Sequence, residues 1–187
     1  MTITVFGSIN MDVTAYADRI PALGETLHGT AYKTGLGGKG GNQAVAAARL
    51  GEPTSMIGRI GGDGFGAEAD KLMAGFGVET DLVLKDKDSA TGIAMIAVDA
   101  NGQNIILVIA GANARVDGSD VERARARLSA SKVLMLQLEV PLTASLTAAA
   151  IVRAAGGIVI LDPAPVPPAG IPKETYAAID IITPNEV

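Results

Sequence analysis

The sequence has no cysteine and no tryptophan, and its aromatic residues are three tyrosines and three phenylalanines. Without cysteine, the 187 residues can form neither disulfides nor thiolate nucleophiles. The single histidine, His28, lies in a polar segment where we expect it at the surface, and no spacing of histidine and carboxylates resembles a metal site. The apolar 48% of the sequence is therefore mostly Ala, Val, Ile and Leu, which is typical of α/β sheets covered by helices.

Positive charge and long apolar runs are also scarce. The formal net charge is −5, so a nucleic-acid-binding surface is not expected. Arg123, Arg125 and Arg127 stand near Glu122 and read as a solvated helix face. The longest apolar run, Ile105–Ala110, is far shorter than the ~20 residues of a membrane-spanning helix. The N-terminus enters a strand pattern without the basic flank of a signal peptide. We predict a cytoplasmic protein with no membrane and no nucleic-acid partner.

Apolar runs alternate with helical patterns along most of the chain. A βαβα order of this kind predicts an α/β fold with a doubly wound, mostly parallel sheet flanked by helices. The expected strands cover residues 2–6, 55–60, 132–137, 158–161 and 179–182. The expected helices cover residues 42–50, 65–75, 119–128, 142–155 and 173–178.

Two segments, residues 12–34 and 91–110, interrupt this order because neither contains a crossover helix. The first holds two alternating stretches, 13–17 and 27–32, and the second reads as a hairpin around Asp99–Gly102. We expect the two segments to form a small separate β sheet that serves as a lid or as a dimer surface. The alternative is that they extend the edge of the main sheet.

The glycine-rich stretch Gly37–Ala44 carries the strongest chemical signal. Its glycines let the backbone approach a ligand closely, and an alanine-rich helix follows, so free N–H groups face the ligand at the positive end of a helix dipole. Lys39 adds a cation, and Asn42 adds a side chain that both donates and accepts hydrogen bonds. This combination suits a polyhydroxylated or anionic small molecule. The plainer alternative is a tight turn packed against a helix.

The same stretch also satisfies a dinucleotide fingerprint, through Gly35, Gly37 and Gly40, with Asp63 at the offset of a ribose-binding acid. Such a fingerprint should follow the first buried strand. Here it follows a short polar segment instead, so an oxidoreductase is the weaker hypothesis. A phosphate-binding Walker loop also fails, because Gly40 rather than Ser or Thr follows Lys39.

Several other motifs accompany this loop in a fixed order: Gly7–Asp12, Pro21–Thr26, Ala110–Ala114, Leu136–Glu139 and Ile182–Glu186. Together with Gly37–Ala44 they resemble the ribokinase family of sugar kinases, also called the PfkB family. The resemblance covers nearly the whole chain and matches the N-terminal portion of that family. It implies one ribokinase-like domain over residues 1–187, with a doubly wound sheet and a small β lid.

The resemblance also implies roles for individual residues. Asn10, Asp12, Gly38, Lys39, Asn42 and Glu139 would bind the sugar, and Asn185 would lie near the nucleotide phosphates. The implied reaction is transfer of the γ-phosphoryl group of ATP to the primary hydroxyl of a pentose, with D-ribose favoured, and with Mg²⁺. Activation by a monovalent cation is left open, and a homodimer through the lid is implied.

Simpler readings exist for three of these residues. Asp12 has the residue type of a turn, and Asn10 that of a cap. Glu139 precedes Val140–Pro141 and is placed where an acid at a helix start would be solvated.

The family's second signature, a glycine-rich Asp-Thr-x-Gly-Ala-Gly-Asp motif, has no counterpart in this sequence. In the family its N–H groups form the anion hole and its last Asp is the base. The resemblance therefore implies that the base lies beyond Val187, and no catalytic residue is assigned in this chain. The Asn-x-x-Glu motif begins at Asn185 and is likewise cut after Val187.

We therefore expect a chain truncated at its C-terminus that carries the sugar-binding half. The rival hypotheses are a non-catalytic sugar-binding or dimerisation module, and another sugar or nucleoside kinase of this family.

Overall fold

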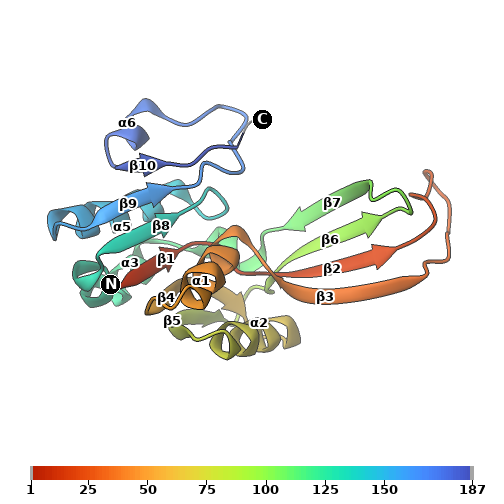
Figure 1. Cartoon of the computed structure of the whole chain (residues 1–187), viewed down its shortest axis with the longest axis horizontal. Coiled ribbons are helices and arrows are strands. Elements are labelled where there is room, and N and C mark those ends of the chain that lie inside the picture. The colour runs from red at the N-terminus through yellow and green to blue at the C-terminus, as the bar shows by residue number, and fades with distance from the viewer. Residues whose placement is uncertain (1, 186–187) are drawn as a thin grey trace.

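Six strands form a parallel main sheet in the order β10-β9-β8-β1-β4-β5 (Figure 1). The computed structural model describes residues 2–185. The strands are β1 (Ile3–Phe6), β4 (Thr54–Gly61), β5 (Val78–Asp86), β8 (Val133–Leu136), β9 (Ile158–Leu161) and β10 (Ile181–Ile182). The predicted doubly wound parallel sheet is confirmed.

Two of the sequence-based expectations fall on residues outside this described range. Val187, beyond which the family base is predicted to lie, is outside the described residues, and so is Glu186 of the Ile182–Glu186 motif. The expected boundary of the domain at Val187 and the placement of the base beyond it therefore stay predictions. Asn185 is the last residue of this motif that the structure describes.

Helices cover both faces of the main sheet, because the side chains of β1 and β4 alternate between two apolar clusters (Figure 1). One cluster packs Val5 and Met56 against α1 (Lys39–Arg49) and α2 (Gly64–Gly75). The other packs Phe6 and Ile57 against three helices on the opposite face. These are α3 (Gly118–Arg123), α4 (Arg125–Ala130) and α5 (Leu142–Ala154). A 3₁₀ helix, η1 (Gly111–Arg115), and a short α6 (Lys173–Tyr176) complete the helices of residues 2–185.

A second sheet extends away from the main one, in the order β3-β2-β6-β7 (Figure 1). Its strands are β2 (Asn10–Tyr16), β3 (Ala31–Gly37), β6 (Gly92–Val98) and β7 (Asn104–Ile109). β2 runs parallel to β6, while the β2–β3 and β6–β7 pairs are antiparallel. The two segments that lack crossover helices therefore form a sheet of their own, and the alternative of an extended main-sheet edge is wrong.

Some predicted element boundaries are wrong. β3 begins at Ala31, not at residue 27, so the fingerprint glycines Gly35 and Gly37 lie in a strand rather than a loop. α1 begins at Lys39, before the predicted residue 42. Its glycines are accommodated because α1 starts against the loop after β1, where a Cβ on Gly40 would lie 2.6 Å from the Ser8 carbonyl oxygen.

The structure also differs from the prediction in one helix and one strand. The predicted helix 119–128 is two helices, α3 and α4, separated at Ala124. β5 was not predicted, because Glu79, Asp81 and Lys85 break its apolar run. β5 is one of the two edge strands of the main sheet, so only part of its surface is buried and its sequence reads as polar.

The two halves of the main sheet are wound in opposite directions from its centre. β1 leads through the second sheet and α1 to β4 on one side, and β8 leads through α5 to β9 on the other. The carboxyl ends of β1 and β8 therefore flank the topological switch point, where ligands of open α/β sheets bind. In the described part of the chain, no helix combines the length and apolar character needed to cross a membrane.

Candidate functional site

The loops that follow β1 and β8 are joined by side chains at the switch point. Ser8 Oγ donates to Glu139 Oε2 at 2.6 Å, and the backbone N–H of Lys39 donates to the same oxygen at 2.9 Å. The N–H of Gly40 in turn donates to Ser8 Oγ at 3.2 Å. Glu139 therefore caps the start of α1 from across the sheet, since the N-cap residue Gly38 has no side chain to do so.

The reading of Glu139 as a solvated acid at the start of the following helix is wrong. Its Oε2 is bound to Ser8 and to the first turn of α1, and its residue is partly buried. Its second oxygen, Oε1, forms no hydrogen bond within residues 2–185 and is free to accept one.

The glycines before α1 bring the backbone close to β2. A Cβ on Gly37 would lie 2.0 Å from Asp12 Oδ1, and a Cβ on Gly38 would lie 2.7 Å from the Asn10 nitrogen. Gly38 also has φ of +79°, which favours glycine. The turn is thus shaped by its contact with Asn10 and Asp12. The alternative of a tight turn that only packs against a helix does not explain this contact.

Asn10 and Asp12 project from the same face of β2, because alternate residues of a strand share a face. Asp12 is half-buried, and its carboxylate has no hydrogen bond or ion pair with any described residue. Burial, followed by the negative charge of Glu139, raises the pKa of Asp12. A partly buried, unpartnered carboxylate with a raised pKa is typical of a functional site.

The other predicted site residues are less closely associated with Asp12. Lys39 is partly buried in the first turn of α1, and its ammonium group has no partner among residues 2–185. Asn42 is exposed and lines a hollow of about 380 Å³ with Met11 and Leu36, which lie on the face of β2 and β3 opposite Asp12. Asn185 is exposed beyond β10, two strands from β8.

Asp63 has a structural role at the start of α2. It is the N-cap of α2 and accepts from the Gly66 N–H at 2.8 Å. It also accepts from the backbone N–H and hydroxyl of Thr91, at 2.8 and 2.6 Å. Burial opposes the charged form, but these hydrogen bonds lower the pKa of Asp63. Both carboxylate oxygens accept hydrogen bonds from the protein, so the capping role accounts for Asp63 and weakens the dinucleotide hypothesis. His28 is exposed, as predicted.

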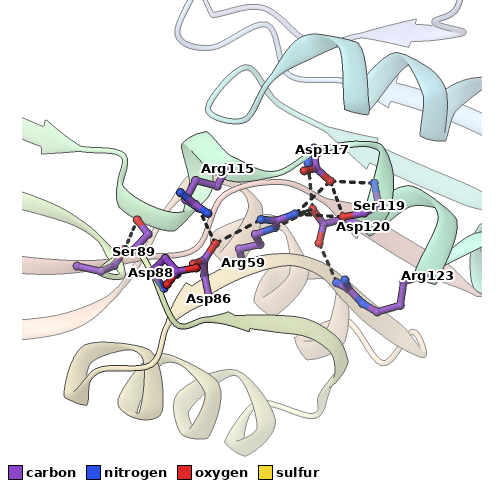
Figure 2. Close-up of polar contacts among 10 residues, drawn as sticks. Arg59, Asp86, Asp88, Ser89, Arg115, Asp117, Ser119, Asp120 and Arg123 are labelled. Carbon is purple, nitrogen blue, oxygen red and sulfur yellow. Dashed lines mark hydrogen bonds and ion pairs between the residues drawn. The ribbon is translucent and has the colours of Figure 1, made fainter.

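A cluster of ion pairs around the buried Arg59 links β4, β5, η1 and α3 (Figure 2). Arg59 of β4 stands between Asp120 and Asp86, with N–O distances of 2.7 and 3.3 Å. Arg115 of η1 binds Asp86 at 2.8 Å, and Arg123 binds Asp120 at 2.9 Å. Burial disfavours the charge of Arg59, yet its acidic partners raise the Arg59 pKa. Because positive and negative side chains alternate, the cluster holds η1 and α3 on the sheet rather than offering an anion site.

Two residues near the site were not singled out from the sequence. Ser8 links Glu139 to α1, and Asn113 of η1 donates to Asn10 Oδ1 at 2.7 Å. Ser8 lies in the Gly7–Asp12 motif and Asn113 in the Ala110–Ala114 motif, so membership of these motifs is the sequence signal for both. No three His, Cys, Asp or Glu residues within 2–185 are grouped to hold a metal ion.

The sequence was compared with protein families and with individual proteins of known function. The sequence matches the family described as pfkB family carbohydrate kinase over residues 2–187. It is 41% identical to the ribokinase of Schizosaccharomyces pombe over 192 aligned residues, covering 100% of this chain and 60% of that protein. It is 36% identical to the ribokinase of Mus musculus, covering 98% of this chain and 57% of that protein.

Solved structures agree with the sequence comparison. The structure of Arabidopsis thaliana ribokinase complexed with ribose and ATP superposes with a TM-score of 0.85 at 33% identity. The superposition covers 98% of this chain and 60% of that one. The chain thus spans about 60% of the length of the relatives that it matches.

Proposed function

The chain belongs to the pfkB family of carbohydrate kinases, and we propose that it carries the sugar-binding part of an ATP-dependent pentose kinase. The proposed reaction transfers the γ-phosphoryl group of ATP to the primary hydroxyl of D-ribose, giving ribose 5-phosphate. The similarity to ribokinases from several organisms supports ribose as the first substrate to test.

The observation that carries the proposal is the Asp12 carboxylate. It is half-buried without a partner among residues 2–185, its pKa is raised by burial and by Glu139, and it shares a strand face with Asn10 at the switch point. A carboxylate can accept hydrogen bonds from two hydroxyl groups at once, so a vicinal diol of a sugar would satisfy both of its oxygens. The remaining proposed sugar contacts come from Gly38, Lys39, Asn42 and Glu139.

These residues would bind and orient the sugar rather than take its proton. Asp63, Asp86 and Asp120 are engaged in hydrogen bonds or ion pairs, so none of them is proposed as the base. The proposal keeps the base in a segment beyond Val187, as the family resemblance implies.

Fewer residues of this chain are proposed for the nucleotide site than for the sugar site. ATP is the phosphoryl donor, and Mg²⁺ would neutralise charge on its phosphates. Asn185 is the proposed contribution of this chain to the nucleotide site. A monovalent cation remains open as an activator.

The second sheet is proposed to be both a lid and a homodimer surface. Its Asn10 and Asp12 face borders the sugar site, and the apolar side chains of its other face surround a hollow of about 350 Å³. Val13, Met95 and Leu107 line this hollow. Sedimentation of the wild type and of Leu107→Lys tests the dimer, and an unchanged monomeric mass for both would refute it. A cytoplasmic location is part of the same proposal.

Titration calorimetry with D-ribose tests the proposal, with Asp12→Asn as the site variant and Asp81→Asn as its control. Asp81 is an exposed strand carboxylate with no partner among the described residues. We expect ribose to bind the wild type and the control, and to bind Asp12→Asn at least about tenfold more weakly. Equal ribose affinities for all three proteins would contradict the proposed site.

A coupled assay for ADP release separates the remaining candidates. Ribose-dependent release supports the kinase, and ribose binding without release supports a sugar-binding module. The second candidate is kept because the chain spans about 60% of its relatives. Preferential binding of fructose or adenosine would favour another kinase of the pfkB family.

A further inference from the structure

Asn113 lies next to Asn10 in the proposed sugar site, and both residues are buried. Asn113 is 1% exposed and Asn10 is 4% exposed. We infer that Asn113 is a positioning residue that turns the Asn10 amide so that Nδ2, and not Oδ1, faces the sugar. This inference rests on the proposed sugar-binding function and specifies which hydrogen bond Asn10 contributes to it.

The orientation of the Asn113 amide is fixed by backbone groups. The N–H of Ile9, which can only donate, lies 2.8 Å from Asn113 Oδ1. The carbonyl oxygen of Ile9, which can only accept, lies 3.0 Å from Asn113 Nδ2. Reversing the amide would place donor against donor and acceptor against acceptor. Asn113 Nδ2 must therefore be the donor toward its neighbours.

The orientation of Asn10 follows from that of Asn113. The second hydrogen of Asn113 Nδ2 is donated to Asn10 at 2.7 Å, so the atom of Asn10 at this contact must be the acceptor Oδ1. Nδ2 of Asn10 then has no hydrogen-bond partner among residues 2–185. Three buried side-chain atoms of these residues lack both partner and solvent: Gln137 Oε1, Ser145 Oγ and Thr175 Oγ1. Asn10 Nδ2 is not one of them, so it remains accessible.

The surroundings hold this pair of amides in place. A Cβ on Gly92 would lie 2.2 Å from Asn10 Oδ1 and 2.3 Å from Asn113 Nδ2, so a glycine is needed beside them. At the far end of η1, Arg115 binds Asp86, which also binds Arg59 (Figure 2). The ion-pair cluster thus fixes the 3₁₀ helix that carries Asn113.

One face of β2 therefore offers the sugar both a hydrogen-bond donor and a hydrogen-bond acceptor. Asn10 presents a hydrogen-bond donor, and Asp12 presents an acceptor to which no described residue donates. An isolated asparagine can do either, but here the acceptor atom of Asn10 is already used. The sugar oxygen at Asn10 therefore acts as an acceptor, while the hydroxyl hydrogens of the sugar are directed to Asp12.

Side-chain amide exchange, measured by NMR on the ligand-free wild type, tests the orientation without any sugar. We expect the Asn113 amide hydrogens to exchange at least about tenfold more slowly than those of Asn10, because both are donated within the protein. Equal protection of the two amides, or greater protection of Asn10, would overturn the inference. This result is independent of whether ribose is the ligand.

Addition of D-ribose then tests the consequence. We expect the Asn10 amide resonances to shift and their exchange to slow, with those of Asn113 unchanged. If the Lys39 and Gly40 amides respond to ribose while the Asn10 amide does not, the inference is wrong although the sugar-binding function stands. If nothing responds to ribose, the proposed ribose function fails, and the ligand-free exchange rates alone decide whether Asn113 orients Asn10.

Asn113→Asp provides the matched variant. A carboxylate at residue 113 still accepts from the Ile9 N–H but cannot donate to Asn10 Oδ1, so the Asn10 amide should turn its Nδ2 inward. We expect the Asn10 amide hydrogens to become protected in the ligand-free variant and ribose affinity to fall at least about tenfold. Unchanged exchange of Asn10 in a folded variant would contradict the inference. If the variant does not fold, the wild-type exchange measurement remains decisive.

Discussion

The hydroxyl of Ser8 donates a 2.6 Å hydrogen bond to Oε2 of Glu139 and so connects the loops after β1 and β8. The contact joins residues that are 131 positions apart in sequence. It places a second carboxylate close enough to Asp12 that the charge of Glu139 contributes to the raised pKa of Asp12. The sugar site that we propose is therefore built around two neighbouring carboxylates, Glu139 bound to the protein and Asp12 without a partner among the described residues.

Glu139→Gln should move the pH dependence of ribose binding. Ribose is expected to need the charged form of Asp12, so affinity in the wild type should fall as pH drops through its raised pKa, above the usual carboxyl value of about 3.9. Removing the charge of Glu139 removes one cause of that rise. Calorimetry between about pH 4 and 8 should show the affinity loss shifted to lower pH. An unchanged pH midpoint of ribose binding would exclude Glu139 as a cause of the raised pKa of Asp12.

Asp12→Asn should stabilise the fold while weakening ribose binding. The charged form of Asp12 is disfavoured by burial and by Glu139, so its folded pKa lies above its unfolded pKa. Folding is then penalised as pH rises through these values, and the penalty is present at pH 7. We expect the melting temperature of Asp12→Asn to rise by about 1–3 °C at pH 7, and Asp81→Asn to leave it unchanged. A lower melting temperature would show that Asp12 stabilises the fold.

The main sheet could be predicted because its central strands are continuous apolar runs. β1 and β8 are packed between helices on both faces and β9 is buried on one face, which leaves few polar residues in them. β5 could not be predicted in this way, because Glu79 and Asp81 lie on an edge strand with exposed positions. The predicted boundaries around Gly37 are wrong because glycine is usually a signal of a loop. There, glycine reflects the close approach of Asp12.

Motifs in the sequence predict the site residues, but they do not predict the hydrogen bonds that connect these residues. Asn10 and Asp12 share a strand face by simple alternation, which any strand assignment implies. The hydrogen bonds of Ser8 to Glu139 and of Asn113 to Asn10 span more than one hundred residues. Such pairs depend on the strand order of the folded sheet, and no local pattern encodes them.

Gly38→Ala should cost more stability than Gly102→Ala, although both glycines have a positive φ of nearly the same size. Their φ angles are +79° and +80°, so alanine is strained at either position by about 1–3 kcal/mol. A Cβ on Gly102 meets nothing within 4 Å, while one on Gly38 lies 2.7 Å from the Asn10 nitrogen. Urea unfolding should show the larger loss for Gly38→Ala, and calorimetry should show weaker ribose binding for that variant alone. Equal losses would show that the contact with β2 is relieved at little cost.

Arg59→Met should destabilise the fold far more than Arg125→Met. Arg59 is 7% exposed and its partner Asp120 is fully buried, so methionine removes the shorter of the two ion pairs of this carboxylate and leaves Arg123 as its only cationic partner among the described residues (Figure 2). Removing one partner of such a pair costs about 3–5 kcal/mol. Arg125 pairs with Glu122 on the surface, with side-chain exposures of 54% and 66%, and its loss should cost no more than about 1 kcal/mol.

The double variant Arg59→Met/Asp120→Asn separates charge from packing as the source of that loss. If the loss of Arg59 charge beside the buried Asp120 carboxylate causes the destabilisation, neutralising Asp120 should restore part of the free energy of unfolding, measured by urea titration with unchanged m-values. Asp120 also accepts from Arg123 and from the N–H of Asp117, so recovery should be incomplete. A double variant no more stable than Arg59→Met would mean that Arg59 stabilises the fold mainly by filling space between β4 and α3.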